Sequence, residues 1–180
     1  MLVWQDIFTN DEVVSDANKP EPVKDSEGEE IPGLFMVQSR NVAVGSDAVD
    51  IGCGDAFGSG DQEVDDSVET VNNISDASIG FAYTEITFAS KTELKSYLKS
   101  YFRKLLNHPT LKEGDEDTVT VFKSDAQKIV KFLLAKYNDL QYYMFRSCDT
   151  EAGLSFSYYP DGATTPVFMY IKWGLKEVKF

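Results

Sequence analysis

The sequence predicts an α+β fold, in which a β-rich body carries one inserted helical hairpin at about residues 90–138. Three observations lead to this class. Apolar runs of strand length stand toward both ends of the chain, apolar residues recur at helical spacing after residue 90, and an acidic, glycine-rich stretch fills about residues 45–68. With 180 residues, 42% of them hydrophobic, the chain is long enough for a core of its own. We therefore expect a single domain over residues 1–180.

The N-terminal segment predicts short strands separated by turns. Residues 2–8 have the apolar content of an opening strand, and Val13-Val14 resume extended structure after a turn at residues 10–12. Residues 17–32 combine prolines with acidic side chains, so we expect a solvated excursion there. Residues 34–37 form an apolar run short enough for a buried strand.

Residues 45–68 alternate acidic side chains with glycine and serine, and Phe57 is their only aromatic residue. Such a stretch buries too little apolar surface to offset its ordering entropy, so we expect a mobile acidic loop. A solvated segment is the simpler interpretation. Weak Ca²⁺ binding is the alternative, since this cation prefers oxygen ligands, but the spacing matches no EF-hand and identifies no metal ligands.

The helical hairpin has the clearest pattern in the sequence. Ser90 and Glu93 have the spacing of a capping box. The apolar residues that follow recur at i, i+3, i+4, i+7, i+8 and i+11, as in an amphipathic helix: Leu94, Tyr97, Leu98, Tyr101, Phe102 and Leu105. A second set has the same spacing: Phe122, Ala126, Ile129, Val130, Leu133, Leu134 and Tyr137. Residues 118–121 fit a strand equally well, so the start of this second helix is open.

Three strand-like runs follow the hairpin, at residues 141–145, 154–159 and 167–171. Pro160-Asp161-Gly162 has the composition of a turn between the last two. These runs complete the β-rich body.

The charge is large and uneven. The chain has 17 basic and 30 acidic residues, a formal net charge of −13, which argues against binding of the whole molecule to nucleic acid or to an anionic membrane. No apolar run is long enough to span a bilayer, and no basic region precedes an apolar stretch at the N-terminus. Cys53 and Cys148 form no CxxC pair, so a disulfide scaffold is not expected. We expect a cytoplasmic protein.

The residues for common enzyme chemistry are scarce. His108 is the single histidine, which excludes sites that need two. It lies beside Pro109, where a solvated loop residue is the simpler interpretation. Cys148 follows a predicted strand, and most free cysteines are small buried hydrophobes. The sequence therefore predicts no enzyme and no required cofactor.

The polar sides of both helices are rich in lysine. Solvated side chains are one interpretation, and a contact with an acidic partner is the other. The residues we select for that contact are Lys91, Lys95, Lys99, Arg103, Lys128 and Lys131.

The two ends of the chain carry distinctive motifs. Near the start, residues 6–16 read Asp-Ile-Phe-Thr-Asn-Asp-Glu-Val-Val-Ser-Asp. Near the close stand residues 149–153, Tyr158-Tyr159, Asp161-Gly162, Pro166 and residues 174–179. Both sets of motifs resemble the translationally controlled tumour protein family. The family's loop signature is reduced here to Ile51-Gly52, and the chain has Phe180 where many members have cysteine.

The resemblance implies a β-tent body like that of the Rab-binding exchange chaperones, and a binding protein linked to calcium, tubulin and growth-related small GTPases. It places the GTPase contact at Asp11 and Glu12, which composition alone would assign to an ordinary turn. Without a terminal cysteine we expect a monomer. The alternative function is a small reductase of the related β-tent type that uses Cys148 as a thiolate.

Overall fold

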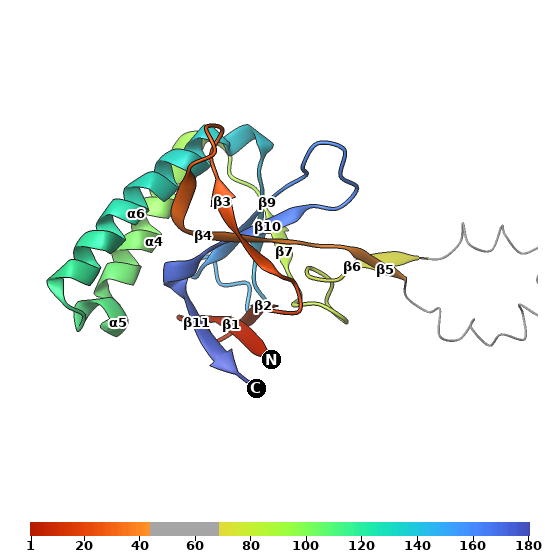
Figure 1. The fold of residues 1–180 in the computed structure, drawn as a ribbon, viewed down its shortest axis with the longest axis horizontal. Helices are drawn as coiled ribbons and strands as arrows, with labels where there is room; N and C mark the ends of the chain where they lie inside the picture. Colours follow the sequence, from red (N-terminus) through yellow and green to blue (C-terminus); the bar gives the residue numbers. More distant parts are fainter. Residues whose placement is uncertain (44–68) are drawn as a thin grey trace, which may run out of the picture.

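The computed structural model describes residues 1–43 and 69–180 (Figure 1). Within these ranges the strands form three antiparallel sheets, the largest in the order β3-β4-β10-β9-β8-β7. Its strands are β3 (Pro20–Lys24), β4 (Glu30–Gln38), β7 (Thr84–Ile86), β8 (Gln141–Met144), β9 (Leu154–Tyr158) and β10 (Val167–Ile171). This sheet-rich body with a few helices confirms the predicted α+β class.

Strand β10 lies at the centre of the molecule, and all five of its residues are buried. Met169 pairs with Met36 of β4 on one side and with Phe156 of β9 on the other. Apolar side chains cover both faces of the strand, since Met169 and Ile171 join one core cluster while Phe168 and Tyr170 join another. A strand that is buried on both faces consists of consecutive apolar residues, and this pattern predicted the strand from the sequence.

The two ends of the chain pair with each other. Strand β1 (Leu2–Asp6) lies between β2 (Glu12–Ser15) and β11 (Leu175–Lys179), and Val3 is opposite Val178. The Met1 amine donates a hydrogen bond to the Phe180 carbonyl at 3.0 Å, and both termini lie at the same edge of the body (Figure 1).

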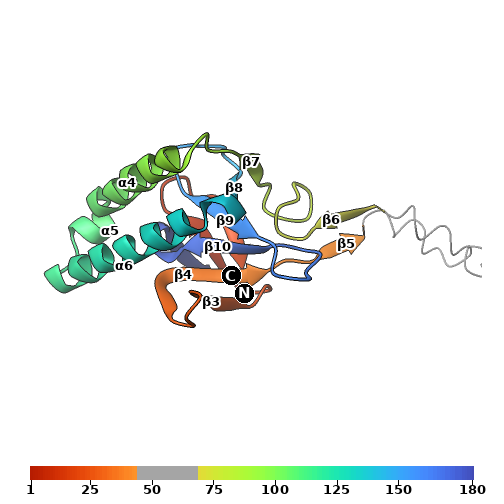
Figure 2. The same ribbon diagram turned by 90° about the horizontal axis from the view of Figure 1, so that it is seen from above.

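Three helices cover one side of the six-stranded sheet: α4 (Lys91–Asn107), α5 (Pro109–Lys112) and α6 (Glu116–Ala135). Figures 1 and 2 show α4 and α6 side by side and antiparallel, with α5 at their turn. The Ser90 hydroxyl accepts a hydrogen bond from the Glu93 N–H, as the capping box predicted, and the Glu93 carboxylate accepts one from the Ala89 N–H.

The structure refines one local expectation and decides one open alternative. Residues 17–32 are mostly exposed, as expected for a solvated segment, but they also contain β3, which pairs with β4 and has Pro20 opposite Val37. Prolines are tolerated in this strand because it is the sheet's edge, where an N–H is not required on the open side. Residues 118–121 are helical, since the Asp115 carboxylate accepts a hydrogen bond from the Thr118 N–H and caps α6 ahead of them.

The remaining elements are short. Strands β5 (Asn41–Ala43) and β6 (Thr70–Asn72) form a ribbon on the far side of the sheet from the helices (Figure 2), and η2 (Tyr137–Asp139) and η3 (Lys172–Gly174) are single 3₁₀ turns. The predicted acidic loop at 45–68 and Cys53 lie outside the described residues. No helix in the described ranges is long and apolar enough to cross a membrane.

Candidate functional site

Four cations form one exposed ridge along α4, which we call the α4 ridge: Lys91, Lys95, Lys99 and Arg103. The opposite face of the helix is fixed in the core, where Leu94, Leu98 and Leu105 are fully buried. The one ion pair within the described ranges joins Lys104 to Glu151, so no described carboxylate lies within ion-pair distance of the ridge. Its positive charges therefore face solvent from a rigid support.

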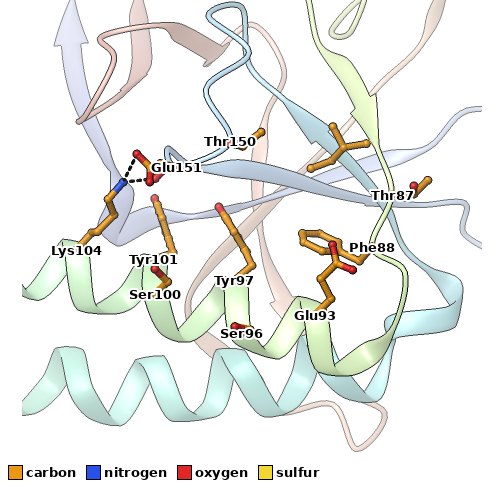
Figure 3. A pocket seen from close by; sticks show the side chains of 11 residues that line it. Thr87, Phe88, Glu93, Ser96, Tyr97, Ser100, Tyr101, Lys104, Thr150 and Glu151 are labelled. Carbon is orange, nitrogen blue, oxygen red and sulfur yellow. Dashed lines mark hydrogen bonds and ion pairs between the residues drawn. The ribbon is translucent and has the colours of Figure 1, made fainter.

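A hollow of about 450 Å³ runs along another side of α4, against residues 150–151 (Figure 3). Tyr97 and Tyr101 point into it with their rings stacked 5.8 Å apart, and the Tyr97 hydroxyl donates to the Ala152 carbonyl at 2.8 Å. Lys104 closes one end, with its Nζ donating to the Glu151 carbonyl at 2.9 Å. Burial raises the pKa of both tyrosines well above the ordinary value, so they stay neutral. These contacts bind α4 to the body.

Lys128 and Lys131 have a different environment on α6. Both line a hollow of about 390 Å³ together with Asp25 and Glu29 from the turn between β3 and β4 and with Glu30 at the start of β4. None of these carboxylates forms an ion pair with the two lysines, but all share the same hollow. The six predicted contact residues therefore differ in their surroundings: the α4 ridge is exposed on one helix, and the α6 pair shares a hollow with acidic side chains.

The predicted acidic pair at the first turn is also divided. Asp11 uses both carboxylate oxygens within the protein, accepting from the Ser147 N–H at 2.9 Å and from the Ser147 hydroxyl at 2.8 Å. Glu12 is exposed at the start of β2. Of the two, Glu12 has the exposed side chain, whereas the Asp11 carboxylate is engaged within the protein.

Asp6 stabilises this turn through hydrogen bonds, a role that the sequence analysis did not predict. Its carboxylate is fully buried and accepts hydrogen bonds from the N–H groups of Phe8, Thr9 and Gly153. Burial raises its pKa, against the lowering effect of these hydrogen bonds. An aspartate followed within three residues by a polar turn is a usable Asx-turn signal. The link to Gly153 has no local signal, since it spans 147 positions.

Cys148 is exposed, not buried as the sequence suggested, and its backbone is left-handed with φ +53°. Its Sγ lies 3.5 Å from the Thr84 hydroxyl. His108 is half-buried, where its Nδ1 accepts from the Thr110 N–H and its ring meets Phe8 edge-on. Over residues 1–43 and 69–180 no three His, Cys, Asp or Glu side chains are grouped for a metal ion.

Comparison with known proteins identifies the family. The sequence model of translationally controlled tumour protein matches residues 1–176. The chain belongs to the translationally controlled tumour protein family. Curated homologues from Plasmodium berghei and Theileria annulata are 38% and 33% identical over 181 aligned positions, with both chains fully covered. This confirms the resemblance at the two ends of the sequence.

Solved structures of the family share the fold. The tumour-associated protein of Schizosaccharomyces pombe aligns with a TM-score of 0.73 at 29% identity, with both chains fully covered. The Caenorhabditis elegans protein aligns with a TM-score of 0.62 at 21% identity, covering all of this chain and 99% of the other, which shows the fold alone. Membership in this family gives no support to the alternative of a Cys148 reductase.

Proposed function

We propose that this protein is a non-enzymatic, cytoplasmic interaction protein that binds acidic protein segments, such as tubulin tails, through the α4 ridge. The observation that supports this function is the free positive charge of Lys95, Lys99 and Arg103 on a helix whose other face is buried. Because exposed charges interact over only about 10 Å at 0.1 M salt, the ridge attracts an acidic segment despite the negative net charge of the molecule.

Microtubule co-sedimentation tests this function. Reversal of Lys95, Lys99 and Arg103 to glutamate places negative charge on the ridge and is expected to abolish sedimentation at low salt. Since the three side chains are exposed, the far-UV circular dichroism spectrum and the melting temperature should change little. Sedimentation of the folded variant at the wild-type level contradicts the proposal.

The α6 pair offers a matched control. Lys95→Gln with Lys99→Gln and Lys128→Gln with Lys131→Gln each remove two positive charges, so net charge changes equally. The first pair should weaken binding more, because Lys128 and Lys131 share a hollow with Asp25 and Glu29 of their own chain, whose negative charge disfavours an acidic partner there. Equal weakening by both pairs indicates a response to net charge and not a contact with the ridge.

The exposed Glu12 supports a second function, contact with a small GTPase. Two sets of internal hydrogen bonds hold its turn: Ser147 donates to the Asp11 carboxylate, and the N–H groups of Phe8 and Gly153 donate to the Asp6 carboxylate. A carboxylate on so fixed a turn can compete for the magnesium ion or the phosphate-loop lysine of a GTPase and weaken nucleotide binding.

Paired titrations of wild type and Glu12→Gln against nucleotide-free and nucleotide-loaded small GTPases test this contact. Binding that prefers the nucleotide-free form and is lost in Glu12→Gln supports it. Binding of both proteins with equal affinity removes Glu12 from the contact. Glu21→Gln, an exposed carboxylate on β3, is the control for a change of one charge.

The family resemblance adds two further elements to the proposal, calcium binding and a role in growth regulation. Calcium would bind weakly at acidic side chains, and calorimetry at millimolar calcium is the direct test. No heat above dilution would remove calcium from the function.

A further inference from the structure

A third hollow, of about 500 Å³, lies where α6, η3, β11 and β1 meet. Asp125, Trp173, Trp4, Glu177 and Lys172 are among its lining residues. None of them belongs to the α4 ridge or to the turn of Glu12, so this hollow is independent of both proposed functions. Its chemistry is that of a carboxylate beside aromatic rings.

Asp125 is the central group of the hollow. It occupies the apolar stripe of α6, three residues after Phe122 and four before Ile129, and its side chain is 8% exposed. Its Oδ2 accepts from the Trp173 Nε1–H at 3.0 Å. In the described part of the chain no cation lies within ion-pair distance of it. One neutral donor compensates a buried carboxylate only in part, so the site favours an added positive charge.

The indole of Trp173 is fixed beside this carboxylate. Gly33 has φ +84°, and a Cβ added there would lie 3.0 Å from the Trp173 Nε1 and 3.0 Å from Ile129 Cδ1. Phe122 meets the indole edge-on, with ring centroids 5.3 Å apart. The indole is half-buried, so part of its surface borders the hollow. An indole face attracts cations, most strongly when they are partly desolvated.

A second negative charge lies at the rim. Glu177 is exposed on β11, directly opposite Trp4 of β1 in the strand register. Two carboxylates and two indoles favour an organic cation over a metal ion, which prefers a fuller set of oxygen ligands. A guanidinium group fits best, because it is weakly hydrated, planar and able to stack on an indole while donating to a carboxylate.

We propose that this hollow is a guanidinium-binding site, in which Asp125 accepts the hydrogen bonds, Trp173 stacks and Glu177 adds attraction at the rim. The guanidinium comes either from an arginine side chain of a protein partner or from a free small molecule. Lys172, exposed at the same rim, is the chain's own competitor for Asp125.

The tryptophans supply a direct signal, since Trp4 and Trp173 are the only two in the chain and both line the hollow. Titration with Nα-acetyl-arginine amide should change the tryptophan emission saturably, whereas the uncharged Nα-acetyl-citrulline amide should not. Trp4→Phe retains the response if Trp173 is the reporter. The proposal is overturned if no guanidinium compound changes the tryptophan emission of either the wild-type protein or Lys172→Gln.

Asp125→Asn is the decisive variant, because an amide oxygen can still accept from Trp173 and so preserves the fold. It should weaken binding by about tenfold or more, since a charge-assisted hydrogen bond is lost. Glu177→Gln should weaken binding about two- to threefold, as expected for an exposed charge. Glu116→Gln, an exposed carboxylate at the start of α6, is the matched control and should bind as wild type. Wild-type affinity in a folded Asp125→Asn contradicts the assignment.

Two arms distinguish the sources of the ligand. Tighter binding of a short peptide with one internal arginine than of agmatine supports a protein partner, and the reverse supports a small molecule. If only Lys172→Gln binds any of these probes, the lysine occupies the carboxylate in the native protein, and the hollow is a closed internal ion-pair site and not a ligand site.

Discussion

Asp11 and Ser147 are 136 positions apart in the sequence and are joined by two hydrogen bonds, at 2.9 and 2.8 Å. This contact ties the turn between β1 and β2 to the loop between β8 and β9. It engages the Asp11 carboxylate within the protein, and Glu12 is the exposed carboxylate of the turn.

Ser147→Ala removes the hydroxyl donor of this contact but keeps the backbone N–H. We expect the free energy of unfolding to fall by about 0.5–1.5 kcal/mol, the usual contribution of one hydrogen bond. Urea denaturation measures it. Ser78→Ala, whose hydroxyl bonds to Asp76 within one local turn, is a comparison that tests whether the long-range link matters more. An unchanged denaturation midpoint for Ser147→Ala contradicts this role.

Asp6 should give the protein an unusual pH dependence. Burial raises its pKa in the folded state above the ordinary 3.8, so between 3.8 and the folded value the folded protein binds more protons than the unfolded chain. The contribution of Asp6 to stability therefore falls as pH rises through that window. Asp76 and Asp115 have pKa values lowered by hydrogen bonds, and their contribution is lost in the opposite direction, as pH falls.

Asp6→Asn isolates the first effect. The free energy of unfolding of wild type and variant should be measured from just below the ordinary aspartate pKa up to neutral pH. The wild-type value minus the variant value should fall as pH rises, because only wild type has a buried carboxyl that loses its proton. The variant also alters hydrogen bonds to Phe8 and Thr9, so the slope and not the offset is the measurement. A difference that is independent of pH shows that Asp6 does not titrate in this range.

Tyr83 and Tyr170 predict a loss of stability in alkali. Their hydroxyls are 2.6 Å apart, and Tyr83 also donates to the Val13 carbonyl. Burial raises the pKa of both tyrosines, so the folded state keeps protons that the unfolded chain releases near pH 10.0. This stability is complete below pH 10.0 and is lost above it. Tyr83→Phe should flatten the alkaline slope, while Tyr159→Phe, at a tyrosine that is 53% exposed, should leave it unchanged.

Gly33 and Gly28 form a natural comparison. Both have left-handed backbones, with φ of +84° and +85°, but a Cβ at Gly33 would press on Trp173 whereas a Cβ at Gly28 would meet nothing within 4 Å. Gly28→Ala should therefore cost about 1–2 kcal/mol from backbone strain alone. Gly33→Ala should cost more, and its tryptophan emission should shift because Trp173 must move. Equal destabilisation by the two variants would show that the indole adapts without strain.

Local patterns predicted the helices well. The apolar stripe of α4 follows the helical repeat, and Ser90 caps it as expected. The start of α6 remained open because the β-branched residues 118–121 suit a strand as well as a helix. The Asp115 cap and the packing of Phe122 in the core resolve this in favour of the helix.

Strands that depend on distant partners were harder to predict. Strand β11 alternates Leu175 and Val178 with charged residues, so it carries little apolar signal of its own, and it is stabilised by pairing with β1 at the other end of the chain. Strand β3 contains two prolines and is ordered by pairing with β4. In both cases the deciding hydrogen bonds come from another strand.

The sequence by itself determined the α+β class, the family through the motifs at its two ends, and the set of charged residues available for binding. These follow from periodicity, composition and motifs, which are properties of neighbouring residues. The tertiary structure alone decided which charges are free. It left Lys95 and Lys99 facing solvent, placed Lys128 and Lys131 against the chain's own acids, joined Asp11 to Ser147 and buried Asp125 beside Trp173. The physical reason is that the availability of a charge depends on the groups within a few ångströms of it, and folding brings those groups from distant parts of the chain.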